Sequence, residues 1–300
     1  MGLRLTLLLM ALLAPAVQAL STPMEYRYWD WGKTAKRDDY QIAVLRLALE
    51  KTVPSHGPYS IVRVVESYST KRLRREVFNG TRINVHVGPW RPQDRANSYD
   101  RNIPIEIPIM GGMLGYRNLI VRRADLAKFR RIEDAADLKR LTAGQGRDWI
   151  EVAMYRNHGY LVDDRANLSS LLAMLVNKRF DYLPMSVIEV ESVLSKEPDL
   201  ARDLAVVPGM LIQYPLPAIF YVSANKPQLA QRLEKGLTMM RKDGSLAQFL
   251  ERSFQRELRK LHSETTREYF LDNPSIPKHM QSPRSVFRTR PGAAPALAKP

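Results

Sequence analysis

The residues best suited to binding a small molecule follow one another between residues 141 and 154, in the sequence LTAGQGRDWIEVAM. Residues 141–143 indicate a buried strand, Gly144 and Gly146 permit a sharp turn, and residues 149–154 are typical of the first turns of a helix. Backbone N–H groups at a helix start lack intrahelical partners and lie at the positive end of the helix dipole, so they suit a carboxylate or another polar acceptor. The ligand contacts expected in this stretch are Gln145, Gly146, Arg147, Asp148 and Trp149.

Two features of this stretch have alternative interpretations. Asp148 either contacts a ligand or caps the helix that follows it, because an aspartate side chain suits both roles. The Gly144-Gln145-Gly146 segment supplies two glycines of a dinucleotide-binding fingerprint, but Trp149 stands where the third is required. We therefore expect no cofactor.

Four further ligand-binding residues are predicted outside this stretch. Trp90 and Arg95 belong to a long loop, residues 88–102, which follows a predicted strand. Long loops that follow strands contain functional residues more often than their length alone would predict. Tyr116 and Arg117 follow a flexible glycine pair, where the chain is expected to cross between two lobes.

Three other segments have a structural explanation beside a functional one. The aromatic residues of 26–31, YRYWDW, either stack on a ligand or pack in the core and at its rim. Ser186 and Glu189 have the spacing of a capping box, which favours a structural role for Ser186 over ligand binding. His86 lies in the alternating segment 83–87, so we expect its side chain to point outward from a half-buried strand.

The sequence lacks the motifs of common hydrolases, since neither Gly-x-Ser-x-Gly nor His-Glu-x-x-His occurs and the five histidines are scattered. The complete absence of cysteine excludes disulfides, a thiolate nucleophile and thiolate metal sites. We expect no catalytic residues and no metal site. The alternative left open is a periplasmic enzyme on the same scaffold, such as a dehydratase or a hydrolase.

The first residues have the pattern of a secretory signal peptide. A basic residue precedes an apolar run from residue 5 to 17, and small residues lead to Ala19. We expect cleavage after Ala19 and release into the periplasm without a lipid anchor. With 46 Lys and Arg against 31 Asp and Glu the formal net charge is +15, which favours an acidic solute or a membrane surface. No stacking motif or basic recognition helix accompanies this charge, so no nucleic acid partner is expected.

Predicted strands alternate with predicted helices along the chain, which indicates an α/β fold with mainly parallel sheets flanked by helices. Extended, proline-marked crossings near residues 110–116 and 210–216 indicate two lobes joined by a two-strand hinge. The predicted segments are a signal peptide at 1–19, a first lobe built from 20–114 and 214–280, a second lobe at 115–213, and a disordered basic tail at 281–300.

Six segments carry a resemblance to a known family: ALEK at 48–51, the Asn79-Gly80 turn, MLGYRNLIV at 113–121, AGQGRDWIEV at 143–152, KRFDYLPMSVIEV at 178–190, and residues 214–250. Taken in this order, they resemble the type II periplasmic solute-binding proteins, in particular the family-3-like substrate-binding subunits of transporters. The resemblance covers nearly the whole chain except the tail.

The resemblance implies two lobes that close over a small polar solute, amino-acid-like or another organic anion, and a monomer that delivers it to the permease of an ABC transporter. A ligand sensor for a membrane receptor has the same closing lobes and stays open as an alternative. In members that bind amino acids, an arginine of the first lobe grips the carboxylate and an acid of the second lobe holds the ammonium. Here Asp181 matches the strand position of that motif, Ser186 stands where the acid is expected, and Arg95 is the nearest candidate for the arginine. This departure argues against an α-amino acid.

Overall fold

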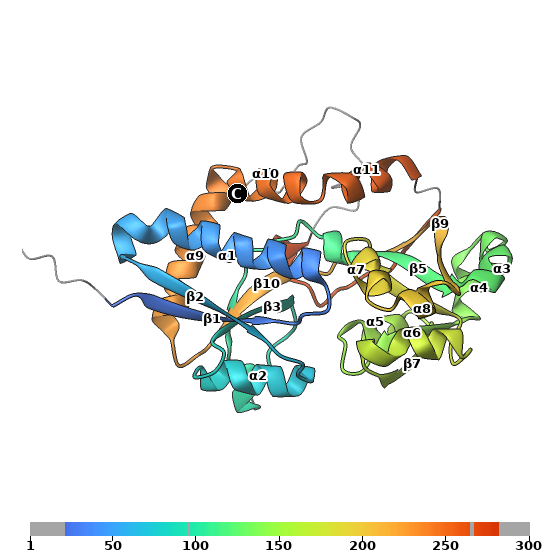
Figure 1. Ribbon diagram of the computed structural model, residues 1–300, viewed down its shortest axis with the longest axis horizontal. Coiled ribbons are helices and arrows are strands. Elements are labelled where there is room, and N and C mark those ends of the chain that lie inside the picture. The colour runs from blue at the N-terminus through green and yellow to red at the C-terminus, as the bar shows by residue number, and fades with distance from the viewer. Residues whose placement is uncertain (1–21, 95, 265–266, 282–300) are drawn as a thin grey trace, which may run out of the picture.

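The computed structural model describes residues 22–94, 96–264 and 267–281. The predicted signal peptide, Arg95 and the predicted tail from residue 282 onward lie outside the described residues. Within the described residues the chain forms two β-sheets, each flanked by helices (Figure 1). The predicted α/β class with two lobes is therefore confirmed.

The first lobe is built on a five-stranded sheet with the order β2-β1-β3-β10-β4. Its strands are β1 (Met24–Asp30), β2 (Tyr59–Val65), β3 (Val85–Pro89), β4 (Ile103–Ile105) and β10 (Ala218–Val222). Helices α1 (Ala35–His56), α9 (Pro227–Lys242) and α10 (Ser245–Ser253) lie over one face, and α2 (Thr70–Asn79) lies over the other (Figure 1). Both faces of the central strands are thus covered.

The second lobe is built on a six-stranded sheet with the order β11-β9-β5-β8-β6-β7. Its strands are β5 (Tyr116–Arg122), β6 (Thr142–Gly146), β7 (Leu161–Ala166), β8 (Tyr182–Ser186), β9 (Leu204–Gln213) and β11 (Arg267–Phe270). Its helices are α3 (Leu126–Arg130), α4 (Ala135–Lys139), α5 (Glu151–Asn157), α6 (Leu168–Val176), α7 (Val190–Ser195) and α8 (Pro198–Ala201). The strands after each crossing, β5 and β10, run antiparallel to both of their neighbours, so each sheet is mixed.

Helices α1 and α9 hold the first lobe together through an unusually close contact. Gly236 on α9 lies so near α1 that an added Cβ atom would overlap the carbonyl group of Ala48. The fully buried Arg232 donates from Nη2 to the carbonyl oxygen of Gly57 at 2.8 Å and from Nη1 to that of Pro58 at 3.2 Å. Carbonyl groups at a helix C-terminus lack intrahelical donors, so this guanidinium satisfies the end of α1.

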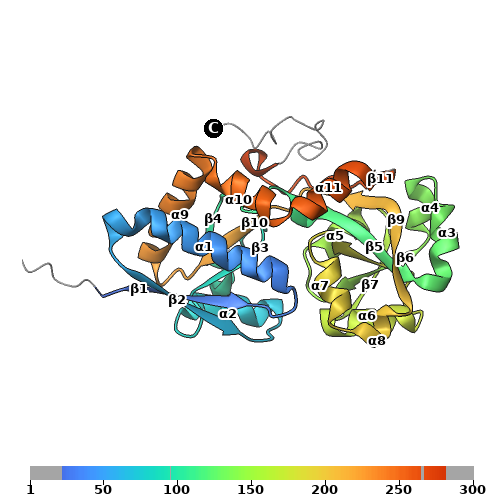
Figure 2. The same ribbon diagram turned by 45° about the horizontal axis from the view of Figure 1, so that its top comes forward.

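Four lengths of chain pass between the lobes in the described part of the molecule (Figure 2). Residues 106–115 connect β4 to β5, and residues 214–217 connect β9 to β10, near the crossings that the sequence predicts. Helix α11 (Gln255–Glu264) leads to β11, which pairs with β9 in the second sheet. The chain then returns, because Ile276 and Met280 pack against the first-lobe strand β10. The predicted first-lobe segment 214–280 therefore contains one strand that belongs to the second sheet.

Candidate functional site

A cleft of about 1260 Å³ lies between the two sheets and is lined by residues of both lobes. Its walls come from the carboxyl ends of β1 and β3 in the first lobe and from the ends of β6 and β7 in the second. Ligands of open α/β sheets bind at the carboxyl ends of strands, because the loops that follow the strands gather there. The cleft is therefore the candidate site.

Aromatic rings stand on both walls of this cleft. Trp29, Trp31 and Tyr68 line the first lobe and Trp149 lines the second. The Trp29 indole N–H donates to the carbonyl oxygen of Glu66 at 2.8 Å, which fixes the ring at the edge of the sheet. Such rings offer large apolar faces to a solute at a small cost in side-chain entropy.

The two glycines of the stretch 144–146 have a different role from the turn that the sequence predicts. Gly144 and Gly146 lie inside β6 rather than in a turn, and the residue with a positive φ, 62°, is Asp148. An added Cβ at Gly144 would overlap the Phe180 ring, and one at Gly146 would overlap the Trp149 ring. The two glycines are thus required for packing, and the tight turn follows them.

The predicted helix start also differs from the expectation. Helix α5 begins at Glu151 and spans seven residues, and no side chain caps it, so Asp148 is not the cap. Ser186 does not form the expected capping box either, because its hydroxyl donates to the carbonyl oxygen of Met113 at 3.1 Å. Ser186 is the last residue of β8, and this bond fixes β8 to the crossing instead of starting a helix.

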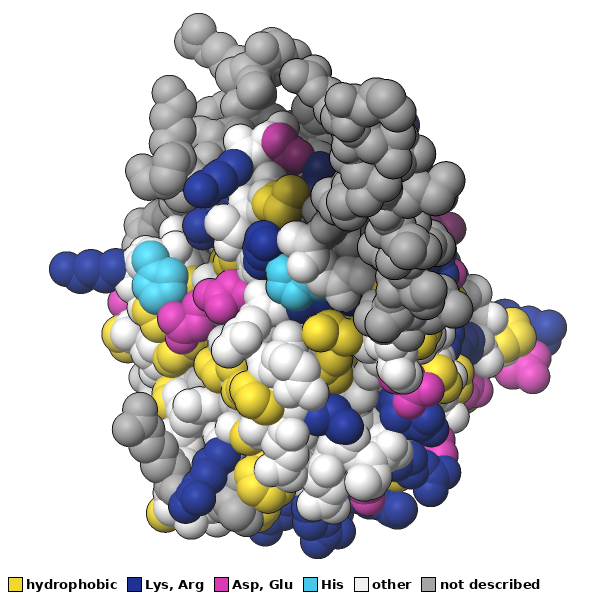
Figure 3. Space-filling model, turned by 90° about the vertical axis from the view of Figure 1, so that its left-hand side faces the viewer, with side chains coloured by type: hydrophobic (Ala, Val, Ile, Leu, Met, Phe, Trp, Pro, Cys, Tyr) yellow, Lys and Arg dark blue, Asp and Glu magenta, His cyan; other side chains and the backbone are white. Residues whose placement is uncertain are grey.

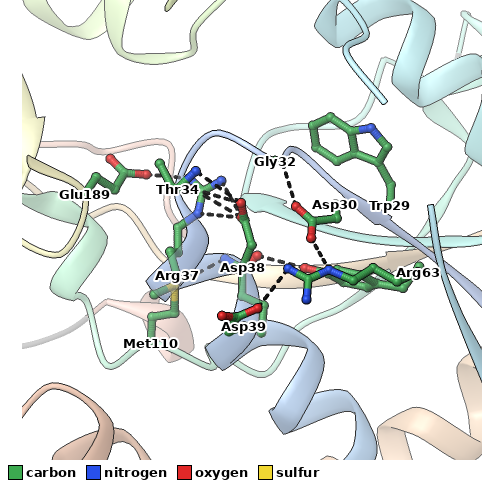
Figure 4. Close-up of polar contacts among 12 residues, drawn as sticks. Trp29, Asp30, Gly32, Thr34, Arg37, Asp38, Asp39, Arg63, Met110 and Glu189 are labelled. Carbon is green, nitrogen blue, oxygen red and sulfur yellow. Dashed lines mark hydrogen bonds and ion pairs between the residues drawn. The ribbon is translucent and has the colours of Figure 1, made fainter. Parts of the chain in front are cut away.

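A chain of charged side chains crosses the cleft from one lobe to the other. Arg117 on β5 donates to Glu151 at 2.6 Å and to Glu189 at 3.4 Å. Glu189 also accepts from Arg37, which belongs to α1 in the first lobe and pairs with Asp38 at 3.1 Å (Figure 4). Every group in this chain therefore has a partner of opposite charge, and the Arg37–Glu189 pair connects the two lobes.

The pKa values of this network reflect burial opposed by pairing. Burial raises the pKa of Glu151, and the charge of Arg117 opposes the shift. Burial lowers the pKa of Arg117, but the charges of Tyr214, Glu151 and Glu189 outweigh this effect, so its pKa is raised overall. The guanidinium stays charged, because its intrinsic pKa already exceeds 12.

The floor of the cleft in the first lobe is formed by His86 of β3 and Tyr221 of β10. The two residues are cross-strand partners, and their rings stack with centroids 5.1 Å apart and planes 13° apart. The Tyr221 hydroxyl donates to the carbonyl oxygen of Pro89 at 3.0 Å and accepts from the backbone N–H of Arg91 at 3.2 Å. This arrangement positions Arg91 beside the imidazole.

His86 is buried, with 4% of its surface exposed, and so does not point to solvent as its alternating sequence suggests. The prediction is wrong because β3 lies between β1 and β10 with helices over both faces of the sheet. The His86 side chain of this strand is buried and lines the cleft. Burial lowers the pKa of His86 to about 3, and the charges of Arg91 and Arg74 act in the same direction.

The cleft is more basic than acidic. Eight Lys and Arg side chains and three Asp and Glu side chains line it among the described residues. On the end of the molecule seen in Figure 3, Lys and Arg side chains are scattered, with acidic side chains among them. The basic excess of the sequence thus has a local counterpart in the cleft, whereas on that end it forms no continuous strip.

In the described part of the chain, no three His, Cys, Asp or Glu side chains come together in a way that could hold a metal ion. The same residues include no helix both long and apolar enough to cross a bilayer.

Comparisons with known proteins identify the fold. A periplasmic binding protein of Salmonella typhimurium with high arginine specificity is similar over 76% of this chain and 98% of its own, with a TM-score of 0.51 and 12% identity. An amino acid ABC transporter substrate-binding protein of Streptococcus pneumoniae, bound to L-arginine, is similar over 77% of this chain and 94% of its own, with a TM-score of 0.51 and 13% identity. The chain has the fold of a periplasmic binding protein.

An ancestral arginine-binding protein bound to glutamine shares this binding-protein fold, with a TM-score of 0.50, 14% identity, and 78% of this chain and 99% of its own covered. No protein-family model and no curated protein sequence matches the chain. At these identities the likeness concerns the fold, so residue roles have to be argued from the cleft itself.

The binding-protein fold brings four of the nine predicted ligand residues to the cleft. These are Arg117, Arg147, Asp148 and Trp149. Arg147 and Asp148 are exposed at its rim, whereas Arg117 is buried in the ion-pair network.

The structure places four other predicted residues away from the cleft surface. Trp90 packs against the hinge-side residues of β10 and donates to Glu106 at 3.2 Å. Tyr116 accepts from Gln213 beneath the crossings, Gln145 is buried in β6, and Gly146 lies under the Trp149 ring. The ninth, Arg95, is outside the described residues.

Several cleft residues were missed or left undecided by sequence reasoning. Trp29 and Trp31 lie in the aromatic segment that had two interpretations, and the structure places both on the cleft wall. Arg37 and Arg74 stand on helices among other charged residues, where nothing in the local pattern distinguishes them from solvent-exposed positions. The available signal was their closeness in sequence to the ends of parallel strands.

Proposed function

We propose that this protein is an extracytoplasmic substrate-binding protein that captures a small polar solute between its lobes and presents it to an ABC-type permease. The observation that carries the proposal is the cleft, which both lobes line with aromatic and basic side chains at the carboxyl ends of their strands. Named proteins with the same fold include an amino acid ABC transporter substrate-binding protein, which supports the same role here. The signal-like first residues support export to the periplasm.

Binding requires only that the solute contacts both lobes more favourably when they are closed. A solute shifts the open and closed populations by its difference in affinity for the two states. The lobes are joined by short connections of the chain (Figure 2). Aromatic residues of both lobes line the cleft between them. Closure then excludes water from the solute, which strengthens each polar contact. No catalytic step is part of the proposal.

The test begins with the solute that the protein carries. Native mass spectrometry of the chain purified from its own periplasm identifies a bound small molecule, and calorimetry measures its affinity. Trp149→Ala should weaken binding at least tenfold, because burying a large apolar side chain contributes about 1.5–3 kcal/mol. Leu161→Ala, an exposed substitution on β7, is the control and should leave the affinity unchanged.

Two results would refute the proposed function. One is the absence of any bound or binding solute in a broad panel of sugars, amino acids and organic anions. The other is a solute whose affinity is the same in the Trp149→Ala protein and in the wild type. Small-angle scattering with and without the solute tests closure separately, since a binding protein of this kind becomes more compact when it is loaded.

A further inference from the structure

The first-lobe floor of the cleft holds an unbalanced group of charges, which we call the floor cluster: Arg74, His86, Arg91 and Asp100. Arg74 Nε lies 3.1 Å from Asp100 Oδ1, and Arg91 Nη2 lies 3.5 Å from the same oxygen. Two guanidinium groups therefore share one carboxylate. Their exposure is low, at 17% for Arg74, 19% for Arg91 and 7% for Asp100, so water screens the excess positive charge poorly.

The arginines of the floor cluster are held in place by their surroundings. The guanidinium of Arg91 lies 5.4 Å from the centroid of the Tyr221 ring, and its backbone is fixed by the Tyr221 hydroxyl. The guanidinium of Arg74 lies 5.1 Å from the centroid of the Tyr99 ring. Both arginines line the cleft, whereas Asp100 stands behind them. The floor cluster thus presents two fixed guanidinium groups to a solute, whereas its carboxylate, Asp100, does not line the cleft.

His86 adds a free hydrogen-bonding group to the same floor. Neither ring nitrogen makes a hydrogen bond of normal geometry in the described part of the chain, and only a backbone group of the adjacent Val87 interacts with the ring, although the side chain is buried and lines the cleft. Buried polar groups without partners are rare, so each requires an explanation. A neutral imidazole offers one N–H donor. The charges of Arg91 and Arg74 act on this imidazole, so the three groups belong to the same part of the floor.

The floor is also left open by the absence of a side chain at Gly88. A Cβ added there would lie 3.3 Å from His86 Cε1 and 3.8 Å from Tyr221 Cε2. Gly88 itself lines the cleft, so the imidazole edge has space above it.

The opposite wall offers no buried carboxylate for a cationic group. Glu151 and Glu189 are the buried acids that line the cleft, and each is already paired with a guanidinium group of Arg117 or Arg37. Arg37 also pairs with Asp38, which does not line the cleft. The third lining acid, Asp148, is exposed at the rim, where water screens its charge. An ammonium group deep in the cleft would therefore have to compete with Arg117 and Arg37 for these carboxylates.

We propose that the captured solute is an organic anion without a compensating ammonium group, and that its carboxylate or phosphate binds the guanidinium groups of Arg74 and Arg91 and the N–H of His86. This inference rests on the proposed function and names the substrate class. Guanidinium groups bind planar carboxylate and phosphate oxygens through paired, charge-assisted hydrogen bonds. The bound oxyanion would also balance the second guanidinium.

The inference is tested on the wild-type protein with two pairs of probes that differ only by an ammonium group. The first pair is succinate and aspartate, and the second is ethyl phosphate and phosphoethanolamine. Calorimetry at low salt should show that one anion binds at least tenfold more tightly than its ammonium-bearing counterpart. The pair that responds distinguishes a carboxylate from a phosphate solute.

Variants then connect the anion to the floor cluster. Arg91→Gln should weaken the binding of that anion at least tenfold, and Arg91→Lys should weaken it less, because the charge is kept without the paired donors. His86→Phe keeps the ring on Tyr221 but removes its N–H, and it should also weaken binding. Arg241→Gln, at an exposed position in the last turn of α9, is the matched control and should have no effect.

The inference is overturned if the ammonium-bearing probes bind as well as the anions, or if Arg91→Gln leaves anion affinity unchanged in a folded protein. It is also overturned if neither anion binds while a sugar or an amino acid does, and in that case the proposed function stands. If no solute of any class binds, both proposals fail together.

Discussion

His86 makes the stability of this protein sensitive to mild acid. Its imidazole is buried and neutral in the folded chain, where its pKa is about 3, whereas an exposed histidine titrates near pH 6.5. The unfolded chain therefore binds a proton below pH 6.5 that the folded chain does not. The stability contributed by the neutral form is complete above pH 6.5 and is lost as the pH falls toward 3.

The size of the loss follows from the difference between the two pKa values. At pH 5 the solution is about 1.5 pH units below the pKa of the unfolded histidine. The free energy of unfolding should therefore be about 2 kcal/mol lower than at pH 7. Buried acids with raised pKa values, such as Glu151 and Asp38, change stability in the opposite direction. Their effect is common to the wild type and to a His86 variant, so it cancels in a comparison of the two.

The assay is urea denaturation of the wild type and His86→Phe at pH 7 and pH 5, with His279→Gln as a control that removes an exposed histidine. The wild type should lose about 2 kcal/mol more of its unfolding free energy than His86→Phe over this interval. His279→Gln should behave as the wild type does. Equal losses in the wild type and His86→Phe would show that the imidazole is protonated in the fold without penalty, and the argument from burial would be wrong.

Three other substitutions test separate contacts. Gly236→Ala forces a methyl group against the carbonyl group of Ala48, and denaturation should show a loss of about 1–3 kcal/mol from overpacking. Gly146→Ala displaces the indole packed on it, so calorimetry should show solute affinity at least tenfold lower while the circular dichroism spectrum stays native. Arg37→Gln removes the ion pair with Glu189 across the cleft, and the radius of gyration of the solute-free protein, measured by small-angle scattering, should rise. An unchanged radius would mean that this pair does not hold the lobes together.

Much of the fold could be predicted because the local signals agree with it. The alternation of strands and helices, and the proline-marked segments near residues 110 and 214, locate the two sheets and the crossings between them. Strand β11 was not predicted, because four residues carry too little periodicity to be recognised. It forms by pairing with β9, and that partner is remote in sequence.

The site was harder to predict because its residues depend on tertiary position. Trp149 and Arg117 lie in segments with evident turn or crossing signals, and both reach the cleft. His86 and Arg74 become important only because β3 is a central strand and α2 packs beside it. An alternating pattern indicates which residues share a face, but it does not say whether that face meets water, a helix or a cleft.

The repeated passage of the chain between the lobes has a topological consequence. A small cavity at the hinge is bordered by Gly112, Tyr116, Pro215, Phe270 and Met280, so the passages meet around one point. A protease cut in either of the connections 106–115 and 214–217 leaves other uncut connections between the lobes. The nicked protein should therefore stay in one piece under native conditions. Such a nick would make the hinge between the two lobes more flexible, and the lobes would stay connected.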